Sequence, residues 1–239
     1  MRRILITGSS RGLGFEFVRQ LLDNGDKIIA CNRNPSKYPE LLELKGKFQD
    51  RLILVDLDVS DKDSIDNAFT IVSQEVEGLD ILINNAGIRF GAQEKYNDEL
   101  GKLYKENFER IFSVNTIAPV LIIERFLPLI KNGENPIIIN ISSTSGSIGR
   151  RSRKGGGYSY SASKAALNMI TKALSVDLEE DGITVVSIHP GWVKTTMEYT
   201  ENAPLTTYES IKGIRNVIDN LSIEETGKFF DWEGNELPW

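Results

Sequence analysis

Short runs of β-branched and aliphatic residues alternate along this chain with longer segments in which apolar residues recur at helical spacing. This alternation is typical of parallel strands joined by crossover helices. It predicts strands near 3–7, 27–31, 51–56, 80–84, 136–142, 183–189 and 227–230, and helices near 12–24, 61–77, 99–131, 158–180 and 206–220. Several strands, such as Ile81-Leu82-Ile83, are apolar on consecutive residues, as strands covered on both faces must be. We therefore expect an α/β fold: a doubly wound parallel sheet of about seven strands with helices on both faces.

Length and composition fit one globular domain. The chain has 239 residues, 40% of them hydrophobic and 26% charged, and the absence of a linker or repeat predicts a single domain over 1–239. The one cysteine, Cys31, cannot form an intramolecular disulfide, and we expect no leader peptide before the strand at Arg3, so both features favour the cytoplasm. The apolar runs are shorter than the roughly 18 residues of a membrane span. The net charge of −6 disfavours binding to nucleic acid.

A glycine-rich segment follows the first predicted strand and opens the first helix, where backbone N–H groups and the helix dipole favour a pyrophosphate. Gly8 permits the tight turn, Gly12 lets the main chain approach the phosphates, and Gly14 allows the helix to pack closely on the strand. The alternative is a glycine-rich turn without a ligand. The spacing T-G-x-x-x-G-x-G resembles the fingerprint of short-chain dehydrogenases/reductases. The resemblance implies a Rossmann fold and dinucleotide contacts from Gly8, Ser10, Arg11, Gly12, Leu13 and Gly14.

Three further segments resemble this family in order, so the resemblance covers nearly the whole chain. It implies that Asp58 and Val59, after the third strand, contact adenine. It implies that the segment after the fourth strand, with Asn84, Ala86 and Gly87, lines the adenine ribose and steadies the sheet. It also implies that a P-G-x-x-x-T turn binds the nicotinamide carboxamide, with contacts from Pro190, Gly191, Val193 and Thr195. Two alternatives stay open: Asp58-Val59 as a cap of the helix near 61, and 84–87 as a plain strand-ending turn.

The end of the second predicted strand bears on the choice between NAD and NADP. NADP carries an additional phosphate, which an acidic side chain repels and an arginine binds through charge-assisted hydrogen bonds. Where NAD enzymes of this family place Asp, this chain has the neutral Asn32, followed at once by Arg33. Arg11 lies where NADP-preferring relatives carry a basic residue. The two cations predict NADP(H), although each arginine alone is also compatible with an exposed surface charge.

A tyrosine and a lysine, Tyr160 and Lys164, lie four residues apart and therefore on one face of the predicted helix 158–180. Carbonyl reduction needs a proton donor, and a cation that stabilises the phenolate lets a tyrosine serve both directions of the reaction. Lys164 is placed to supply that field, and the resemblance implies that both residues also contact the cofactor, the lysine through the nicotinamide ribose. Tyr158 has no such partner, because position 162 is alanine. The alternative for the pair is a solvated helix face.

Polar residues in two other segments complete the catalytic set. The fifth predicted strand ends in Ser142-Ser143, at the carboxyl edge where doubly wound sheets hold their active sites. A hydroxyl there donates a hydrogen bond to the substrate carbonyl as negative charge develops. The resemblance selects Ser143, with Ser142 and Ser145 as other candidates and a strand-capping serine as the non-catalytic alternative. Asn115 resembles the family asparagine that kinks the long helix and holds a water in the proton relay.

The segment between Ser143 and Tyr160 is longer than in many enzymes of the family, because 17 positions separate the two residues. The excess lies in the basic and glycine-rich stretch 150–157. A similarly lengthened segment occurs in the branch of C-factor-like and sniffer-like carbonyl reductases, which 158–168, 189–193 and the chain end also resemble. The basic loop 150–154 departs from that pattern. It either attracts an acidic substrate or partner, or it is a solvated loop.

Several functions are compatible with these residues. The first is reduction of an aldehyde or ketone, or oxidation of the matching alcohol, with NADP(H). The second is a dinucleotide-binding signalling or developmental protein of the C-factor type, with incidental turnover. An extended-family sugar epimerase fits less well, because only a short segment follows Thr195. We expect 196–220 to form a lid and substrate wall, with Met197, Tyr199, Leu205 and Tyr208.

The expected partners are a small-molecule carbonyl or alcohol substrate and a second copy of the chain. Proteins of the family that this chain resembles often dimerise through the long helices that correspond to 99–131 and 158–180. The apolar positions of these two segments are more numerous than one core-facing stripe needs, so the resemblance implies a homodimer. We expect no contact with nucleic acid or a membrane. His189 is the only histidine, so a histidine-based triad or a clustered metal site is excluded, and no metal is expected.

Overall fold

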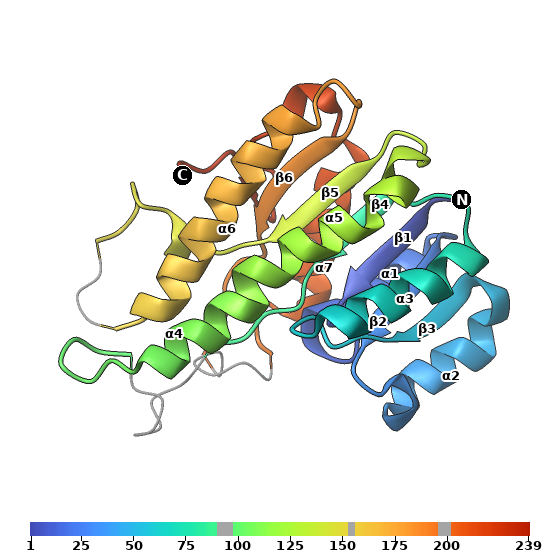
Figure 1. Ribbon diagram of the computed structural model, residues 1–239, viewed down its shortest axis with the longest axis horizontal. Coiled ribbons are helices and arrows are strands. Elements are labelled where there is room, and N and C mark those ends of the chain that lie inside the picture. The colour runs from blue at the N-terminus through green and yellow to red at the C-terminus, as the bar shows by residue number, and fades with distance from the viewer. Residues whose placement is uncertain (90–97, 153–155, 196–201) are drawn as a thin grey trace.

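Seven parallel strands form one sheet in the order β3-β2-β1-β4-β5-β6-β7 (Figure 1). The structure, a computed structural model, describes residues 1–89, 98–152, 156–195 and 202–239. The strands are β1 (Arg3–Thr7), β2 (Lys27–Asn32), β3 (Leu52–Asp56), β4 (Ile81–Asn84), β5 (Ile137–Ile141), β6 (Thr184–His189) and β7 (Phe229–Asp231). The predicted doubly wound parallel sheet is confirmed.

Helices cover both faces of this sheet (Figure 1). They are α1 (Gly12–Asp23), α2 (Pro39–Phe48), α3 (Lys62–Glu75), α4 (Lys105–Phe112), α5 (Ala118–Lys131), α6 (Tyr158–Asp177) and α7 (Thr207–Asp219). Apolar side chains of α1, α2 and α7 pack on one face, and those of α3 and α5 pack on the other. We call the apolar cluster under α1, α2 and α7 the first core and the cluster under α3 and α5 the second core. Within β1, Ile4 and Ile6 belong to the first core, while Leu5 belongs to the second. This division explains why the strands are apolar on consecutive residues.

Two helices differ from the sequence prediction. Helix α2 was not predicted, although Pro39 at its first turn is a recognisable helix start. The long helix expected over 99–131 begins at Lys105, and a π-helical turn, Ser113–Ile117, interrupts it between α4 and α5. Among the described residues, the continuous helix Lys105–Lys131 is long and apolar enough to cross a membrane, contrary to the expectation from its shorter apolar runs. Half of its apolar window is buried, as in the core helix of a globular fold.

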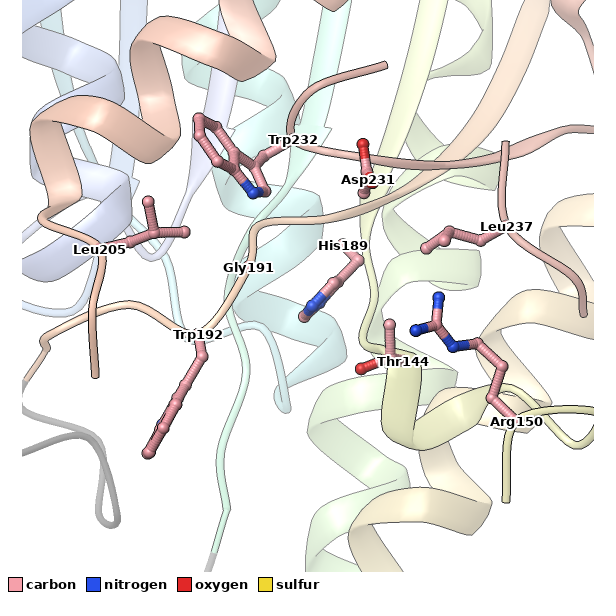
Figure 2. A pocket seen from close by; sticks show the side chains of 9 residues that line it. All are labelled: Thr144, Arg150, His189, Gly191, Trp192, Leu205, Asp231, Trp232 and Leu237. Carbon is pink, nitrogen blue, oxygen red and sulfur yellow. The ribbon is translucent and has the colours of Figure 1, made fainter. Parts of the chain in front are cut away.

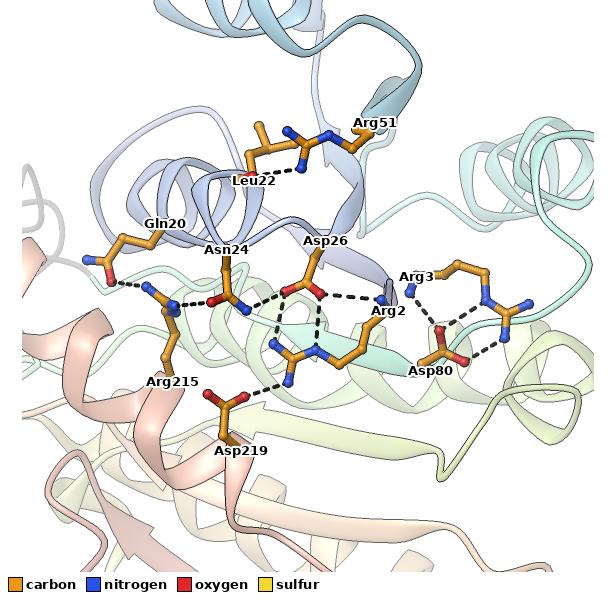
Figure 3. A network of polar contacts seen from close by, with 10 residues as sticks. All are labelled: Arg2, Arg3, Gln20, Leu22, Asn24, Asp26, Arg51, Asp80, Arg215 and Asp219. Carbon is orange, nitrogen blue, oxygen red and sulfur yellow. Dashed lines mark hydrogen bonds and ion pairs between the residues drawn. The ribbon is translucent and has the colours of Figure 1, made fainter.

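A polar network holds the amino-terminal edge of the sheet, opposite the strand ends that carry the candidate site (Figure 3). The Asp80 carboxylate accepts hydrogen bonds from the backbone N–H of Arg3 (2.6 Å) and from its Nε (3.0 Å) and Nη2 (2.6 Å). It also accepts one from the N–H of Glu134 (2.7 Å). Burial raises the pKa of Asp80, but the hydrogen bonds from Arg3 and Glu134 outweigh it, and the net pKa lies below the ordinary value. The charged form is therefore stabilised by folding.

We expect Asp80→Asn to lower the free energy of unfolding by about 2–3 kcal/mol, because Asp80 is 4% exposed and the change leaves the partly buried Arg3 without its counter-charge. The contribution of Asp80 to stability is present above its unfolded pKa of about 3.9 and is lost as the pH falls through the lower folded pKa. Urea unfolding at pH 7 and pH 3 measures both effects. Asp219→Asn is the matched control, since Asp219 forms a more exposed ion pair with Arg2 and its loss should cost under about 1 kcal/mol.

Candidate active site

The candidate site lies at the carboxyl ends of the strands, where the strand order reverses. From β1 the chain moves outward to β2 and β3, then returns to place β4 on the other side of β1. The strand order therefore reverses between β1 and β4, and doubly wound folds bind ligands at the carboxyl ends of the strands beside such a switch point. The sequence-predicted cofactor and catalytic residues follow β1, β2, β3, β4, β5 and β6 at this edge or lie on helices beside it.

The glycine-rich segment forms a tight turn between β1 and α1. Gly8 has φ +67°, and a Cβ at this position would lie 2.9 Å from the Cα of Ala86. A Cβ on Gly14 would overlap the carbonyl oxygen of Gly8. Helix α1 starts at Gly12 without a side-chain cap, so its first N–H groups face the turn, and Arg11 beside them is exposed. These features match an anion-binding helix start. Ser10 also lies on this turn, while Leu13 packs against the core.

Thr7 and Asn85 fasten this turn to the segment after β4. Thr7 Oγ1 accepts hydrogen bonds from the N–H groups of Asn85 (3.1 Å) and Ala86 (3.0 Å). Asn85 Nδ2 donates to the carbonyl oxygens of Thr7 (2.9 Å) and Gly8 (3.1 Å). Sequence reasoning gave Asn85 no role of its own, although its place within Asn84-Asn85-Ala86-Gly87 was a signal. Its amide sets the shape of the glycine turn.

Asn84 points into the sheet and links neighbouring strands. Its Nδ2 donates to Asn140 Oδ1 (2.9 Å), Asn140 Nδ2 donates to Thr171 Oγ1 (2.9 Å), and Ser187 Oγ donates to the same hydroxyl (2.9 Å). Asn84 is buried, at 3% exposure. This geometry accounts for the sheet-steadying part of the role expected for 84–87. Among its neighbours, Gly87 lies beside Asn115 and Lys164, with its Cβ position 3.8 Å from Lys164 Nζ.

Arg33 and Asn32 lie where the adenosine ribose is expected. Asn32 is buried, and its Oδ1 accepts a hydrogen bond from Ser9 Oγ (3.0 Å). The side chain of Arg33 is 70% exposed, with Nη1 4.0 Å from Asp58 Oδ2. Asp58 is not the cap of α3, because Asp61 accepts the capping hydrogen bond from Asp63 N–H. The capping alternative for Asp58 is therefore wrong.

The segment after β6 returns to the glycine turn. The Pro190 carbonyl accepts a hydrogen bond from Ser210 Oγ (2.6 Å), and Val193 is buried and forms a β-bridge with Leu205. Thr195 lies opposite the glycine-rich turn between β1 and α1, with its side chain 3.8 Å from the Cβ position of Gly12. Val59, in the segment after β3, packs against the second core. The structure therefore places the expected nicotinamide-binding turn beside the glycine-rich turn.

Tyr160 and Lys164 lie on α6 beside the end of β5. Lys164 is buried, its Nζ donates to the Ile141 carbonyl (2.7 Å), and burial lowers its pKa to about 8. Burial also raises the pKa of Tyr160, while the charge of Arg89 and a hydrogen bond with Ser143 act in the opposite direction. The Arg89 guanidinium carbon lies 5.2 Å from the centre of the Tyr160 ring. Sequence reasoning missed Arg89, since nothing local distinguishes it from an exposed arginine.

The three candidate serines after β5 have different environments. Ser142 Oγ donates to Asn168 Oδ1 (2.6 Å) inside the protein, so its hydroxyl proton is used in a buried hydrogen bond between the segment after β5 and α6. Ser145 contributes its N–H to Ser143 Oγ (3.1 Å). Ser143 is the one whose side chain also forms a hydrogen bond with Tyr160. The geometry favours the choice of Ser143 over Ser142.

Asn115 lies in the π-helical turn and is fully buried. Its Oδ1 accepts from the Ile88 N–H (2.8 Å), and its Nδ2 donates to the Ile88 carbonyl (2.9 Å) and to Ser163 Oγ (3.2 Å). The π turn is the irregularity that an asparagine in an apolar helix suggested. It places Asn115 between the segment after β4 and α6, next to Lys164.

A pocket of about 280 Å³ lies at the same edge of the sheet, after β5, β6 and β7 (Figure 2). It is lined by Thr144, Arg150, His189, Gly191, Trp192, Leu205, Asp231, Trp232 and Leu237. Leu205 is thus one of the expected substrate-wall residues that reaches a pocket. Tyr208 lies elsewhere, with the Arg19 guanidinium carbon 5.7 Å from its ring centre. Met197 and Tyr199 lie outside the described residues, as do Arg153 and Lys154 of the basic loop.

Comparisons of the sequence and of the structure with known proteins find the same kind of protein. The family model described as "short chain dehydrogenase" matches residues 2–205. The structure of an NADPH-bound carbonyl reductase from chicken fatty liver is 37% identical, with a TM-score of 0.92, and the alignment covers 100% of this chain and 99% of that one. The carbonyl reductase Sniffer of D. melanogaster is 32% identical, with a TM-score of 0.92, over 100% of both chains.

The C-signal protein of Myxococcus xanthus is 37% identical over 161 residues, which are 67% of this chain and 93% of that protein. The suggested resemblance to the C-factor-like and sniffer-like branch is therefore confirmed. Since the family model spans most of the sheet and full-length neighbours share its fold, the chain belongs to the short-chain dehydrogenase family.

Proposed function

We propose that this short-chain oxidoreductase reduces aldehydes or ketones with NADPH and oxidises the matching alcohols with NADP⁺. The observation that carries the proposal is the meeting of Tyr160, Ser143 and Lys164 at the carboxyl end of β5, because it combines a proton donor, a hydrogen-bond donor and a cation. NADP is favoured by Arg11 and Arg33, and by the neutral Asn32. The chicken and fly neighbours are both carbonyl reductases, and the chicken enzyme binds NADPH.

The residues present fit a dinucleotide along the carboxyl edge of the sheet. The uncapped start of α1 and the absence of a side chain on Gly12 leave room and donors for the phosphates, and Thr195 lies opposite. When bound, NADPH supplies the hydride. Tyr160 then donates its phenolic proton to the carbonyl oxygen, and Ser143 donates a hydrogen bond to the same oxygen as its negative charge grows. Lys164, with Asn115 beside it, stabilises the phenolate that remains and holds the nicotinamide ribose.

Steady-state oxidation of NADPH with a broad panel of aldehydes and ketones tests this function. The expected result is turnover of several carbonyls that depends on Tyr160. The resemblance to C-signal keeps a signalling protein as the second candidate, since that relative matches two thirds of the chain. Tight NADPH binding by calorimetry without turnover of any panel member would favour that second function over the first.

Helices α5 and α6 support a homodimer. Ile117, which ends the π-helical turn before α5, is 51% exposed, and Met169 and Val176, two turns apart on α6, are 67% and 62% exposed. The π-helical turn packs beside α6, and large apolar side chains this exposed on neighbouring elements fit a surface covered by a second copy. Light scattering at micromolar concentration should give twice the chain mass of 26.8 kDa. Met169→Glu with Val176→Glu should halve that mass, and a monomeric wild type would contradict the proposal.

The remaining expectations concern the domain organisation, the lid and the cellular location. A single domain over 1–239 stays a prediction. Of the expected lid 196–220, residues 196–201 lie outside the described part of the chain, and Leu205 lines the pocket. Residues Thr207–Asp219 form α7, whose apolar side chains pack into the core of the sheet, so this part of the expected lid is wrong. The acidic chain, with a net charge of −6 and one buried cysteine, fits a cytoplasmic protein that contacts neither nucleic acid nor a membrane. Cell fractionation tests the location.

A further inference from the structure

The pocket of Figure 2 adjoins the proposed reaction centre. Thr144 directly follows Ser143, and Gly191 and Trp192 belong to the turn expected at the nicotinamide. The pocket is formed at the carboxyl ends of β5, β6 and β7, the same sheet edge that holds Tyr160 and Lys164. The pocket is therefore placed to hold the part of a substrate that lies beyond a carbonyl bound at Ser143.

One end of the pocket presents hydrogen-bond donors. The Arg150 guanidinium and the His189 imidazole face the same space above Thr144 (Figure 2). Among the residues that the structure describes, no carboxylate lies within ion-pair distance of Arg150, and His189 Nδ1 is a buried nitrogen without a hydrogen-bond partner. Burial lowers the pKa of His189 to about 4, so the imidazole is neutral at physiological pH and one ring nitrogen carries a proton. A buried ring nitrogen without a partner indicates a place for a polar ligand group.

The only acid on the pocket wall, within the described part of the chain, is Asp231, and its oxygens are already used. Oδ1 accepts hydrogen bonds from the N–H groups of Glu233 (2.9 Å) and Asn235 (2.9 Å), and Oδ2 accepts from Asn235 Nδ2 (3.0 Å). The carboxylate thus serves the turn after β7 and forms no ion pair with Arg150. The guanidinium remains available to an anion that enters the pocket.

The rest of the wall is apolar and aromatic. The apolar residues on the wall are Trp192, Trp232, Leu205 and Leu237, and Leu205 and Trp192 lie on the side away from Arg150 (Figure 2). Such a lining favours a flat or branched hydrocarbon body and disfavours a highly hydrated group such as a sugar. A guanidinium binds a planar carboxylate through two parallel hydrogen bonds.

We propose that this pocket binds a carboxylate of the substrate, with Arg150 as the specificity residue, so that the enzyme prefers carbonyl compounds bearing a carboxylate on an apolar or aromatic body. The inference rests on the proposed function and names its substrate class. Arg150 is separated in the chain from the reacting groups and acts on binding, whereas Tyr160 and Ser143 act on the carbonyl.

A matched pair of substrates tests the proposal: 4-carboxybenzaldehyde and its uncharged methyl ester, methyl 4-formylbenzoate, each with NADPH. The wild type should show a lower KM for the acid. In Arg150→Ala the ratio of KM for the acid to KM for the ester should rise about tenfold or more, the scale of one charge-assisted contact, with a smaller change in kcat. Arg150→Lys should restore part of the difference, because the charge stays but the planar pair of donors is lost.

Arg151→Ala is the matched control, since it removes the same charge one residue away. Arg151 donates to Ser161 Oγ (3.2 Å) and to the Gly156 carbonyl (3.0 Å) and does not line the pocket. It should keep the wild-type KM ratio. An equal rise of this KM ratio in Arg150→Ala and Arg151→Ala would overturn the proposal. It would instead indicate long-range electrostatic attraction of the acid by the basic loop, and in that case added salt should abolish the preference for the acid.

The outcomes separate this proposal from the function on which it rests. Reduction of the ester with no preference for the acid overturns the carboxylate pocket and leaves carbonyl reduction intact. If neither aldehyde is reduced, binding of 4-(hydroxymethyl)benzoate still tests the pocket, followed by the tryptophan fluorescence of the protein, to which Trp192 and Trp232 on the pocket wall contribute. Binding that weakens about tenfold in Arg150→Ala supports it, and unchanged binding overturns it.

Discussion

Tyr160→Phe should lower kcat by about 100- to 10,000-fold, the range typical of the loss of a general acid, while the fold and NADPH affinity stay nearly unchanged. Only a hydroxyl is removed, and the ring that packs under Arg89 remains. Because burial raises the pKa of Tyr160, the wild-type phenol is protonated at neutral pH and available as the donor. Stopped-flow measurement of NADPH oxidation with a good carbonyl substrate, together with calorimetric NADPH titration, measures both quantities.

Three companion variants separate the roles of the neighbouring groups. Tyr158→Phe is the control and should be nearly silent, because Tyr158 is 36% exposed and lacks the lysine partner. Ser143→Ala should lower turnover with little effect on cofactor affinity, whereas Lys164→Ala should weaken both. Retention of most activity by Tyr160→Phe would show that the proposed proton transfer is wrong, even with the fold and NADP site unchanged.

Arg33→Asp should erase or reverse the preference for NADPH over NADH. A charge-assisted contact to the additional phosphate contributes about 1.5–3 kcal/mol, or roughly tenfold to more than a hundredfold in affinity, and an aspartate adds repulsion. The side chain of Arg33 is 70% exposed and its ion pair with Asp58 is long at 4.0 Å, so the substitution should cost little stability. Calorimetric titration with each cofactor gives the two dissociation constants.

Arg33→Lys is the appropriate comparison, because it keeps the charge and should retain a reduced preference for NADPH. Equal affinity of the wild type for NADPH and NADH would remove the basis of this prediction. Should Arg33→Asp lose affinity for both cofactors equally, the arginine would contribute to a part of the dinucleotide that the two share.

Much of the fold and part of the site are local properties of the sequence. Consecutive apolar residues and helical spacing predicted all seven strands and most helices, since these patterns reflect which faces of an element are covered. Helix α2 has one buried residue, Leu41, and only partly buried Leu44 and Phe48 beside it, so its apolar stripe is too weak to be recognised. Gly8, Gly14 and the four-residue spacing of Tyr160 and Lys164 were also predictable, because turn geometry and helix periodicity fix them within one short segment.

Contacts between distant segments were decided by the tertiary structure alone. The sequence could not tell Ser142, bonded to Asn168, from Ser143, bonded to Tyr160, because the two serines are neighbours of the same kind. Arg89 lies over the Tyr160 ring, and Arg150 and His189 line one pocket. Both arrangements depend on which loops meet at the edge of the sheet. Local patterns record only how each segment is covered, whereas the environment of a polar side chain depends on groups that folding brings from elsewhere in the chain.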